Sequence, residues 1–209
     1  MHIPDGMLPV SVCAVGYGIT GITTGYYIKK IQMKEDPKED IPKASLTTAA
    51  FFVASLIHIP IPPTSVHLLL TGLLGILLGE YAFLSVVVSL FFQAVMFQHG
   101  GLTTLGVNAV IIGIPAVVSS FIYRNGKKYL KNDFLAFITG VIGTGFAVLL
   151  FFLTIIYSIP AEIDAAAEKM AIYASVTAHM PLMLIEGVFT VLVIRYIKKV
   201  KPELLKENE

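Results

Sequence analysis

The chain has 209 residues, of which 56% are hydrophobic and 14% are charged, and its mean hydropathy is +0.79. Soluble domains carry about 25% charged residues, so this composition predicts an integral membrane protein with no soluble domain. The basic residues are not interleaved with aromatic residues, which argues against nucleic-acid binding. The single cysteine, Cys13, excludes an internal disulfide.

The first six residues, Met1-His2-Ile3-Pro4-Asp5-Gly6, are the most specific feature of the chain. No basic stretch precedes an apolar run, so we expect no cleavable signal peptide, and the bulky His2 should keep Met1 in place. Three nitrogens can then chelate one metal ion in fused rings: the α-amine of Met1, and the backbone and imidazole nitrogens of His2. The Pro-Asp-Gly turn should bend this segment toward the bundle, with Asp5 stabilising the bend.

The remainder of the chain predicts an all-α membrane bundle of seven spanning helices, because each span takes about 20 apolar residues. We expect one domain over residues 1–209, with a chelating segment (1–7), a helical bundle (8–197) and a basic tail (198–209). The expected spans are Leu8–Ile28, Ala44–Ile59, Val66–Gly79, Tyr81–Gln98, Leu102–Tyr123, Asp133–Tyr157 and Met170–Ile197. Four glycines of the first span allow another helix to approach closely: Gly16, Gly18, Gly21 and Gly25.

The distribution of positive charge predicts the orientation of these spans. Of 15 Lys and Arg residues, five lie within Lys29–Lys43, four within Arg124–Lys131 and five from Arg195 to the end of the chain. Cytoplasmic loops carry the excess of basic residues, so we expect the N-terminus outside and the C-terminus inside. All five histidines then lie at or near the outer side, which indicates a binding event that faces outward.

His67 is the candidate fourth ligand, and we expect it in the first turn of the third span. An ionisable group at membrane depth is costly and usually functional. Four nitrogens in a square suit Ni(II) and Cu(II) better than Zn(II), which prefers tetrahedral sites. His58, at the end of the second span, is either an interfacial residue or a neighbour of the metal.

Other polar residues are candidates for a supporting role around the metal. His99 and Asn108 either orient the ligands or cap an irregular turn around Gly100-Gly101, where we expect non-helical backbone facing a cavity. His179 and Glu186 are seven residues apart, nearly on one helix face, and a structural or orienting role is favoured over direct ligation. No nucleophile–base, zinc-protease or phosphate-loop motif is present, so we expect no enzyme.

Four parts of the chain together resemble the nickel/cobalt substrate-binding subunits of energy-coupling factor transporters, the CbiM/NikM family. These parts are the opening hexapeptide, Val66-His67, the stretch from Gln98 to Asn108 and the stretch from His179 to Gly187. The resemblance covers essentially the whole chain. It implies a six-helix S-component core with an added N-terminal helix in the cytoplasmic membrane. It also implies Ni(II), with Co(II) as the alternative, held by Met1, His2 and His67.

The resemblance further implies partners: a transmembrane coupling subunit, two cytoplasmic ATPases and a small accessory membrane protein. Ala50 and Ala54 resemble the Ala-x-x-x-Ala face by which S components contact the coupling subunit. Three rival functions remain open: cobalt uptake for cobalamin synthesis, a stand-alone metal permease or channel, and an intramembrane metalloenzyme built on His179 and Glu186.

Overall fold

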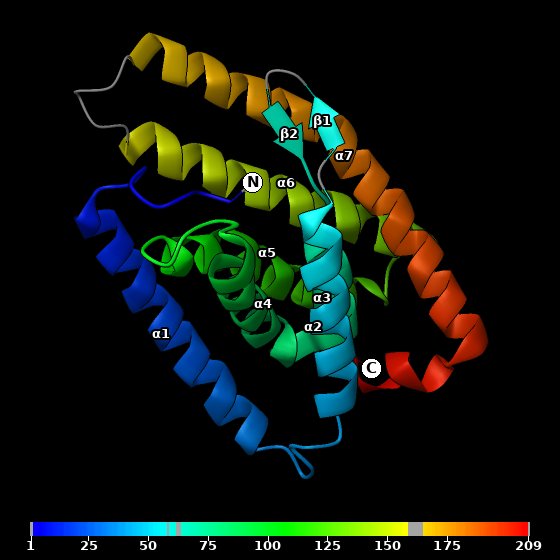
Figure 1. Cartoon of the computed structure of the whole chain (residues 1–209). Coiled ribbons are helices and arrows are strands. Elements are labelled where there is room, and N and C mark those ends of the chain that lie inside the picture. The colour runs from blue at the N-terminus through cyan, green and yellow to red at the C-terminus, as the bar shows by residue number, and fades with distance from the viewer. Residues whose placement is uncertain (1, 58, 62–63, 159–164, 209) are drawn as a thin grey trace.

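Long apolar runs form helices in this chain because a helix satisfies its backbone polar groups within its own segment, as a lipid environment requires. The computed structural model describes residues 2–57, 59–61, 64–158 and 165–208 (Figure 1). The α-helices are α1 (Val10–Gln32), α2 (Ile41–Leu56), α3 (Thr71–Leu78), α4 (Ala82–Phe97), α5 (Leu105–Gly126), α6 (Asn132–Ser158) and α7 (Ala165–Val200). Shorter elements are strands β1 (Ile59–Ile61) and β2 (Thr64–Val66) and 3₁₀-helices η1 (Gly79–Tyr81) and η2 (Pro202–Asn208).

Within the described ranges, four helical stretches are long and apolar enough to cross a membrane. The first joins α3, η1 and α4, and the others lie in α5, α6 and α7: Thr71–Phe97, Leu105–Gly126, Asn132–Ser158 and Tyr173–Val200. Helix α2 is apolar but has only 16 residues. The helical, multi-pass character of the chain is confirmed, and the count of seven spans stays a prediction.

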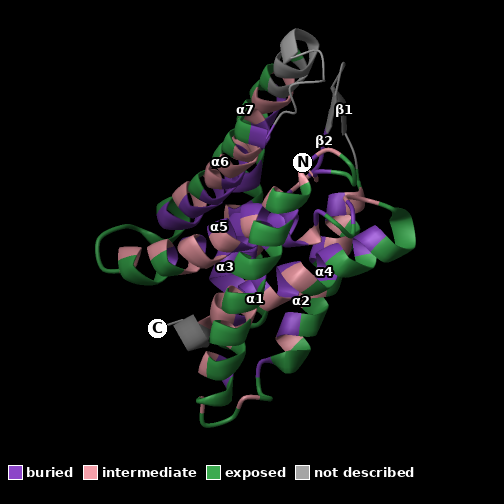
Figure 2. Ribbon diagram, turned by 90° about the vertical axis from the view of Figure 1, so that its left-hand side faces the viewer, coloured by how far each residue is buried: buried purple, intermediate pink, exposed green. Residues whose placement is uncertain are grey.

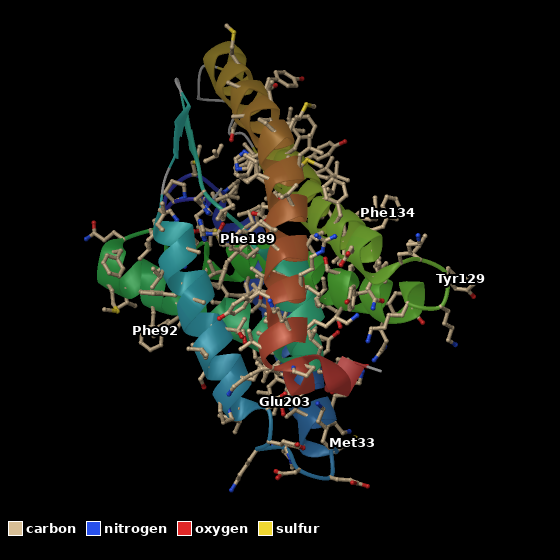
Figure 3. The ribbon with its side chains drawn as sticks, turned by 90° about the vertical axis from the view of Figure 1, so that its right-hand side faces the viewer. Met33, Phe92, Tyr129, Phe134, Phe189 and Glu203 are labelled. Atoms are coloured by element: carbon tan, nitrogen blue, oxygen red, sulfur yellow. The ribbon has the colours of Figure 1, made fainter. Side chains whose placement is uncertain are left out.

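Helix α3 lies at the centre of the bundle, and all eight of its residues are buried (Figure 2). It packs against α5 and α6, whereas α1 and α2 present exposed faces at the periphery. Large apolar side chains on the outer helices point away from the bundle, among them Phe92 of α4 and Phe134 of α6 (Figure 3). Exposed apolar surface on this scale marks a lipid-facing exterior.

Helices α1 and α5 approach each other closely where both carry glycine. A Cβ atom on Gly16 would lie 2.7 Å from the backbone nitrogen of Val107, and one on Gly106 would lie 2.5 Å from that of Tyr17. The predicted close approach to the first helix is therefore confirmed at Gly16. The remaining three glycines of α1 have no atom within 4 Å of such a Cβ in the described structure: Gly18, Gly21 and Gly25.

The structure of the segment before α3 differs from the sequence-based prediction in two respects. Strands β1 and β2 pair antiparallel, with Ile59 opposite Val66, so the described fold is helical apart from this hairpin. The predicted third helix should begin at Val66, but α3 begins only at Thr71. The placement of His67 in a helical turn is therefore wrong. The helix starts late because Leu70 has a left-handed backbone (φ 52°), which a continuing right-handed helix does not allow.

The segment predicted as a basic tail contains regular structure. Helix α7 continues to Val200, past the predicted end at Ile197, and η2 then folds back toward α3. Leu205 packs against the hydrophobic core, and Figure 1 places the C-terminus beside the bundle. The burial of an apolar side chain explains why this segment does not extend into solvent.

Candidate metal centre

Three histidines from separate segments converge at one end of the bundle. His2 comes from the N-terminal segment, His67 follows β2, and His99 lies between α4 and α5. One ring nitrogen from each lies within 4.8 Å of those of the other two. Nitrogen ligands on opposite sides of one ion lie about 4.2 Å apart when each bond is about 2.0–2.1 Å. Small rotations of the imidazole rings would therefore let all three histidines bind one ion.

Within this cluster, Nδ1 of His2 and Nε2 of His67 lie 3.1 Å apart. Nδ1 of His67 lies 3.1 Å from the carbonyl oxygen of Leu68. A proton on that Nδ1 would leave the Nε2 lone pair directed at His2 and at any shared ion. His67 is 1% exposed, so the protein environment fixes this geometry with little solvent contact.

The backbone after His67 is held by a buried carboxyl group from α7. Glu186, which is 1% exposed, accepts hydrogen bonds from the backbone N–H groups of Leu69 and Leu70. Thr144 of α6 donates its hydroxyl to Oε2 of Glu186 at 2.8 Å. Two helices thus fix the short non-helical stretch that carries His67. This geometry agrees with the predicted orienting role of Glu186. Thr144 was not singled out from the sequence. A threonine within a strongly apolar helix is nevertheless a signal that could have identified it as a buried hydrogen-bond donor.

The N-terminal segment is held by Asn108 in the manner of a β-ladder. Ile3 N–H donates to Oδ1 of Asn108 at 2.9 Å, and Nδ2 of Asn108 donates to Ile3 C=O at 3.0 Å. The hydroxyl of Thr104 also donates to Ile3 C=O, at 2.6 Å. Ile3 is fully buried and Asn108 is 2% exposed. The N–H and C=O groups of Ile3, which follow His2, therefore both form hydrogen bonds inside the protein. These bonds fix the direction of the His2 side chain.

Asp5 attaches the same segment to the loop before α5. Its carboxylate accepts hydrogen bonds from the N–H and hydroxyl groups of Thr103 and from the N–H of Leu102. The hydrogen bond from the Thr103 hydroxyl has the largest influence on the pKa of Asp5 and holds it below its ordinary value, whereas desolvation acts in the opposite direction. A Cβ atom on Gly101 would overlap Asp5 and lie 2.6 Å from its backbone nitrogen. The expected stabilising role of Asp5 agrees with these contacts.

The loop that carries His99 has the irregular backbone expected from its sequence. Gln98 (φ 53°) and Gly100 (φ 83°) both have left-handed conformations, which turn the chain sharply on each side of His99. The His2 and His99 rings have centroids 4.2 Å apart, closer than the 4.8 Å between His2 and His67. His99 was assigned an orienting or capping role from the sequence, but it lies inside the ligand cluster itself.

The other predicted residues lie outside this cluster. His179 is fully buried in α7, and its Nδ1 lies 2.7 Å from the carbonyl oxygen of Ser175. Its Nε2 has no hydrogen-bond partner among the described residues. Its helix packs beside the His67 segment through Ala178 and Leu182, which contact Val66. Met1 and His58 lie outside the described residues. Ala50 is exposed on α2, and Ala54 is partly buried against the core.

A multi-pass helical fold with three converging, largely enclosed imidazoles defines a membrane protein that can hold a transition-metal ion. Comparison with known proteins agrees with this class. The family model described as "Cobalt uptake substrate-specific transmembrane region" (CbiM) matches residues 2–204. The chain therefore belongs to the CbiM family, and it is a substrate-specific component of cobalt or nickel transport rather than an enzyme.

Individual relatives agree over nearly the full length. The chain is 34% identical to a protein of Methanocaldococcus jannaschii named as a cobalt transport protein CbiM, covering 98% of this chain and 90% of the relative. It is 32% identical to a protein of Archaeoglobus fulgidus named as a fused nickel transport protein NikMN, covering 100% of this chain and 69% of the relative. A crystal structure of a truncated transition metal transporter is similar with a TM-score of 0.83 and 28% identity, covering 95% of this chain and 99% of that one.

Proposed function

We propose that this chain captures Ni(II), with Co(II) as the alternative cargo, as the substrate-binding subunit of an ATP-driven energy-coupling factor transporter. The observation that carries the proposal is the convergence of His2, His67 and His99. Imidazole nitrogens suit these ions, and no carboxylate of the described chain joins the cluster. The names of the relatives include both cobalt and nickel transport proteins, in agreement with this choice of cargo.

The orientation of the His2 ring supports chelation through the start of the chain. A six-membered chelate ring that includes the backbone nitrogen of His2 closes through Nδ1, and this is the nitrogen that faces His67. Adjacent corners of a square with bonds of about 2.0–2.1 Å are about 2.8–3.0 Å apart, close to the observed 3.1 Å. The α-amine of Met1 would complete the square. His99 would then lie beside the plane as a fifth neighbour of the ion.

The distribution of charge supports an outward-facing site. Lys30 at the end of α1 forms an ion pair with Glu80, which follows the end of α3 that is remote from His67. At the end of α7, Arg195 forms an ion pair with Asp133 at the start of α6. If these basic ends face the cytoplasm, as the excess of positive charge predicts, the histidine cluster faces the outer side of the membrane.

The proposed partners are a transmembrane coupling subunit, two ATPases and a small accessory membrane protein. Exposure of Ala50 on α2 is compatible with the proposed contact between Ala50, Ala54 and the coupling subunit. Uptake measured in membranes with and without these partners distinguishes this proposal from a stand-alone permease. Metal uptake by the reconstituted single chain would support the permease instead. A Co(II) preference would favour the alternative of cobalt supply for cobalamin synthesis.

The decisive experiment is isothermal titration of Ni(II) into two purified forms of the chain. One form has a free Met1 amine, and the other carries two additional residues before Met1; a form extended by two residues at the C-terminus is the matched control. We expect tight binding with proton release in the native and control forms, because the chelating amide must lose its proton. Equal binding by the form extended before Met1 would refute the N-terminal chelate. His67→Ala and His99→Ala then measure the contribution of each imidazole.

A further inference from the structure

A small pocket of about 150 Å³ lies between the C-terminal parts of α1 and α5 and the turn η1, at the other end of α3 from the histidine cluster. This pocket is lined by two cations, one carboxylate, two hydroxyl-bearing side chains and an apolar edge. The residues that matter here are Tyr27, Lys30, Glu80, Ser120, Phe121 and Arg124. The pocket shares no residue with the proposed metal centre.

The charges in the pocket leave one positive charge unbalanced. Lys30 Nζ lies 2.9 Å from Glu80 Oε1, and these side chains are 40% and 21% exposed. Arg124 is exposed and forms no ion pair with any described residue. Lys30, Glu80 and Arg124 line the same pocket as the Tyr27 phenol. Two cations and one anion therefore leave a net charge of about +1, which matches a phosphodiester.

We propose that this pocket binds the phosphodiester of an anionic membrane lipid. The Arg124 guanidinium provides a planar pair of donors that fits two phosphate oxygens. Ser120 lies one helical turn before Arg124 on α5, so its hydroxyl is a further donor on the same face. Basic pockets between membrane helices on the cytoplasmic side are recognised sites for anionic head groups, and the excess of positive charge assigns this end to the cytoplasm.

The apolar edge of the pocket favours a lipid over free phosphate. Val117 and Phe121 are one turn apart on α5, and Phe121 is 60% exposed. They give the pocket a wall that continues into the lipid-facing exterior, where acyl chains would lie. The pocket holds two cations against one carboxylate, and Arg124 has no described ion-pair partner, so an ammonium group on a zwitterionic head group would face repulsion from Arg124. An anionic head group avoids that repulsion.

Titration of lipids into the full-length, delipidated chain by native mass spectrometry tests the proposal. The probes are phosphatidylglycerol, phosphatidylcholine with the same acyl chains, and inorganic phosphate. We expect phosphatidylglycerol to bind most tightly and Arg124→Gln to weaken that binding about fivefold, since one basic residue near an anionic surface contributes about 1 kcal/mol. Glu80→Gln should strengthen binding by a similar factor, because it removes the opposing carboxylate.

Lys128→Gln is the matched control, because it removes an exposed cation from the same region without touching the pocket. It should bind phosphatidylglycerol like the wild type. Nickel titration of Arg124→Gln should also match the wild type, which shows that the variant is folded and separates this site from the metal centre. Equal binding of both lipids, or an unchanged Arg124→Gln, would overturn the proposal. Binding of inorganic phosphate without a preference for phosphatidylglycerol would assign the pocket to free phosphate instead.

Discussion

Replacement of Glu186 by alanine should weaken metal binding although Glu186 is not a ligand. Its carboxyl group accepts the N–H groups of Leu69 and Leu70 and the hydroxyl of Thr144. Each buried donor left unpaired costs about 1–3 kcal/mol, so the two backbone groups alone correspond to about 2–6 kcal/mol. The Thr144 hydroxyl can turn to a backbone carbonyl of its own helix, so it adds little to this sum.

The loss should appear in both stability and affinity. Without Glu186 the stretch that carries His67 is no longer held in its non-helical path, and loss of a group that orients a ligand typically costs 10–100-fold in metal affinity. Glu186→Gln retains one carbonyl oxygen and should fall between the wild type and the alanine variant. Thr144→Val is the matched control, because it removes one hydroxyl while both N–H groups stay paired.

Thermal unfolding in detergent and isothermal titration of Ni(II) measure these effects. We expect Glu186→Ala to unfold at a lower temperature and to bind nickel at least tenfold more weakly, with Thr144→Val close to the wild type. Nickel affinity of Glu186→Ala equal to that of the wild type would refute the view that this carboxyl group positions His67. Equal damage from Thr144→Val would show that packing between α6 and α7 matters more than the anchored backbone.

The contacts of the N-terminal segment lead to three further predictions. Asn108→Ala leaves the N–H of Ile3 unpaired, and we expect about 1–3 kcal/mol lower stability and weaker nickel binding by titration. Gly101→Ala forces a methyl group into Asp5 and should lower nickel affinity severalfold, whereas Gly18→Ala, which faces open space, should bind like the wild type. The pKa of Asp5 is lowered in the folded protein, so its stabilising contribution is complete above its unfolded pKa of about 3.9 and decreases as pH falls through the lower folded value. Unfolding temperatures of the wild type and Asp5→Asn should therefore converge below about pH 4, and a constant gap across that range would contradict this assignment.

The sequence singled out two of the three converging histidines as ligands, but not the backbone geometry that brings the third beside them. His2 and His67 were predicted as ligands from the chelating start of the chain, the expected membrane depth of His67 and the family resemblance, and the structure brings their ring nitrogens within 3.1 Å of each other. The position of His99 did not follow, since it depends on left-handed backbone at Gln98 as well as Gly100. A non-glycine residue in that conformation carries no reliable signature in a single sequence.

The start of α3 was mispredicted for a related reason. Val66 to Leu70 is an apolar run that local pattern assigns to a helix. The backbone donors of Leu69 and Leu70 instead bond to Glu186, which is more than 100 residues away in the chain. Tertiary contacts of this range override local preference. The break near Glu80 was expected and is present as η1, because a charged residue between two apolar runs marks a turn within the sequence itself.

The contacts of residues 2–5 also bear on how the protein is made. His2 meets a partner 65 positions later, Ile3 one 105 positions later and Asp5 one 98 positions later. These residues are synthesised well before their partners, and closing loops of this length is slow compared with forming a local helix. The contacts of Ile3 and Asp5 can therefore form only after the start of α5 and the loop before it have been synthesised. The cluster of His2, His67 and His99 is therefore complete only in a chain that has been synthesised at least as far as the loop before α5.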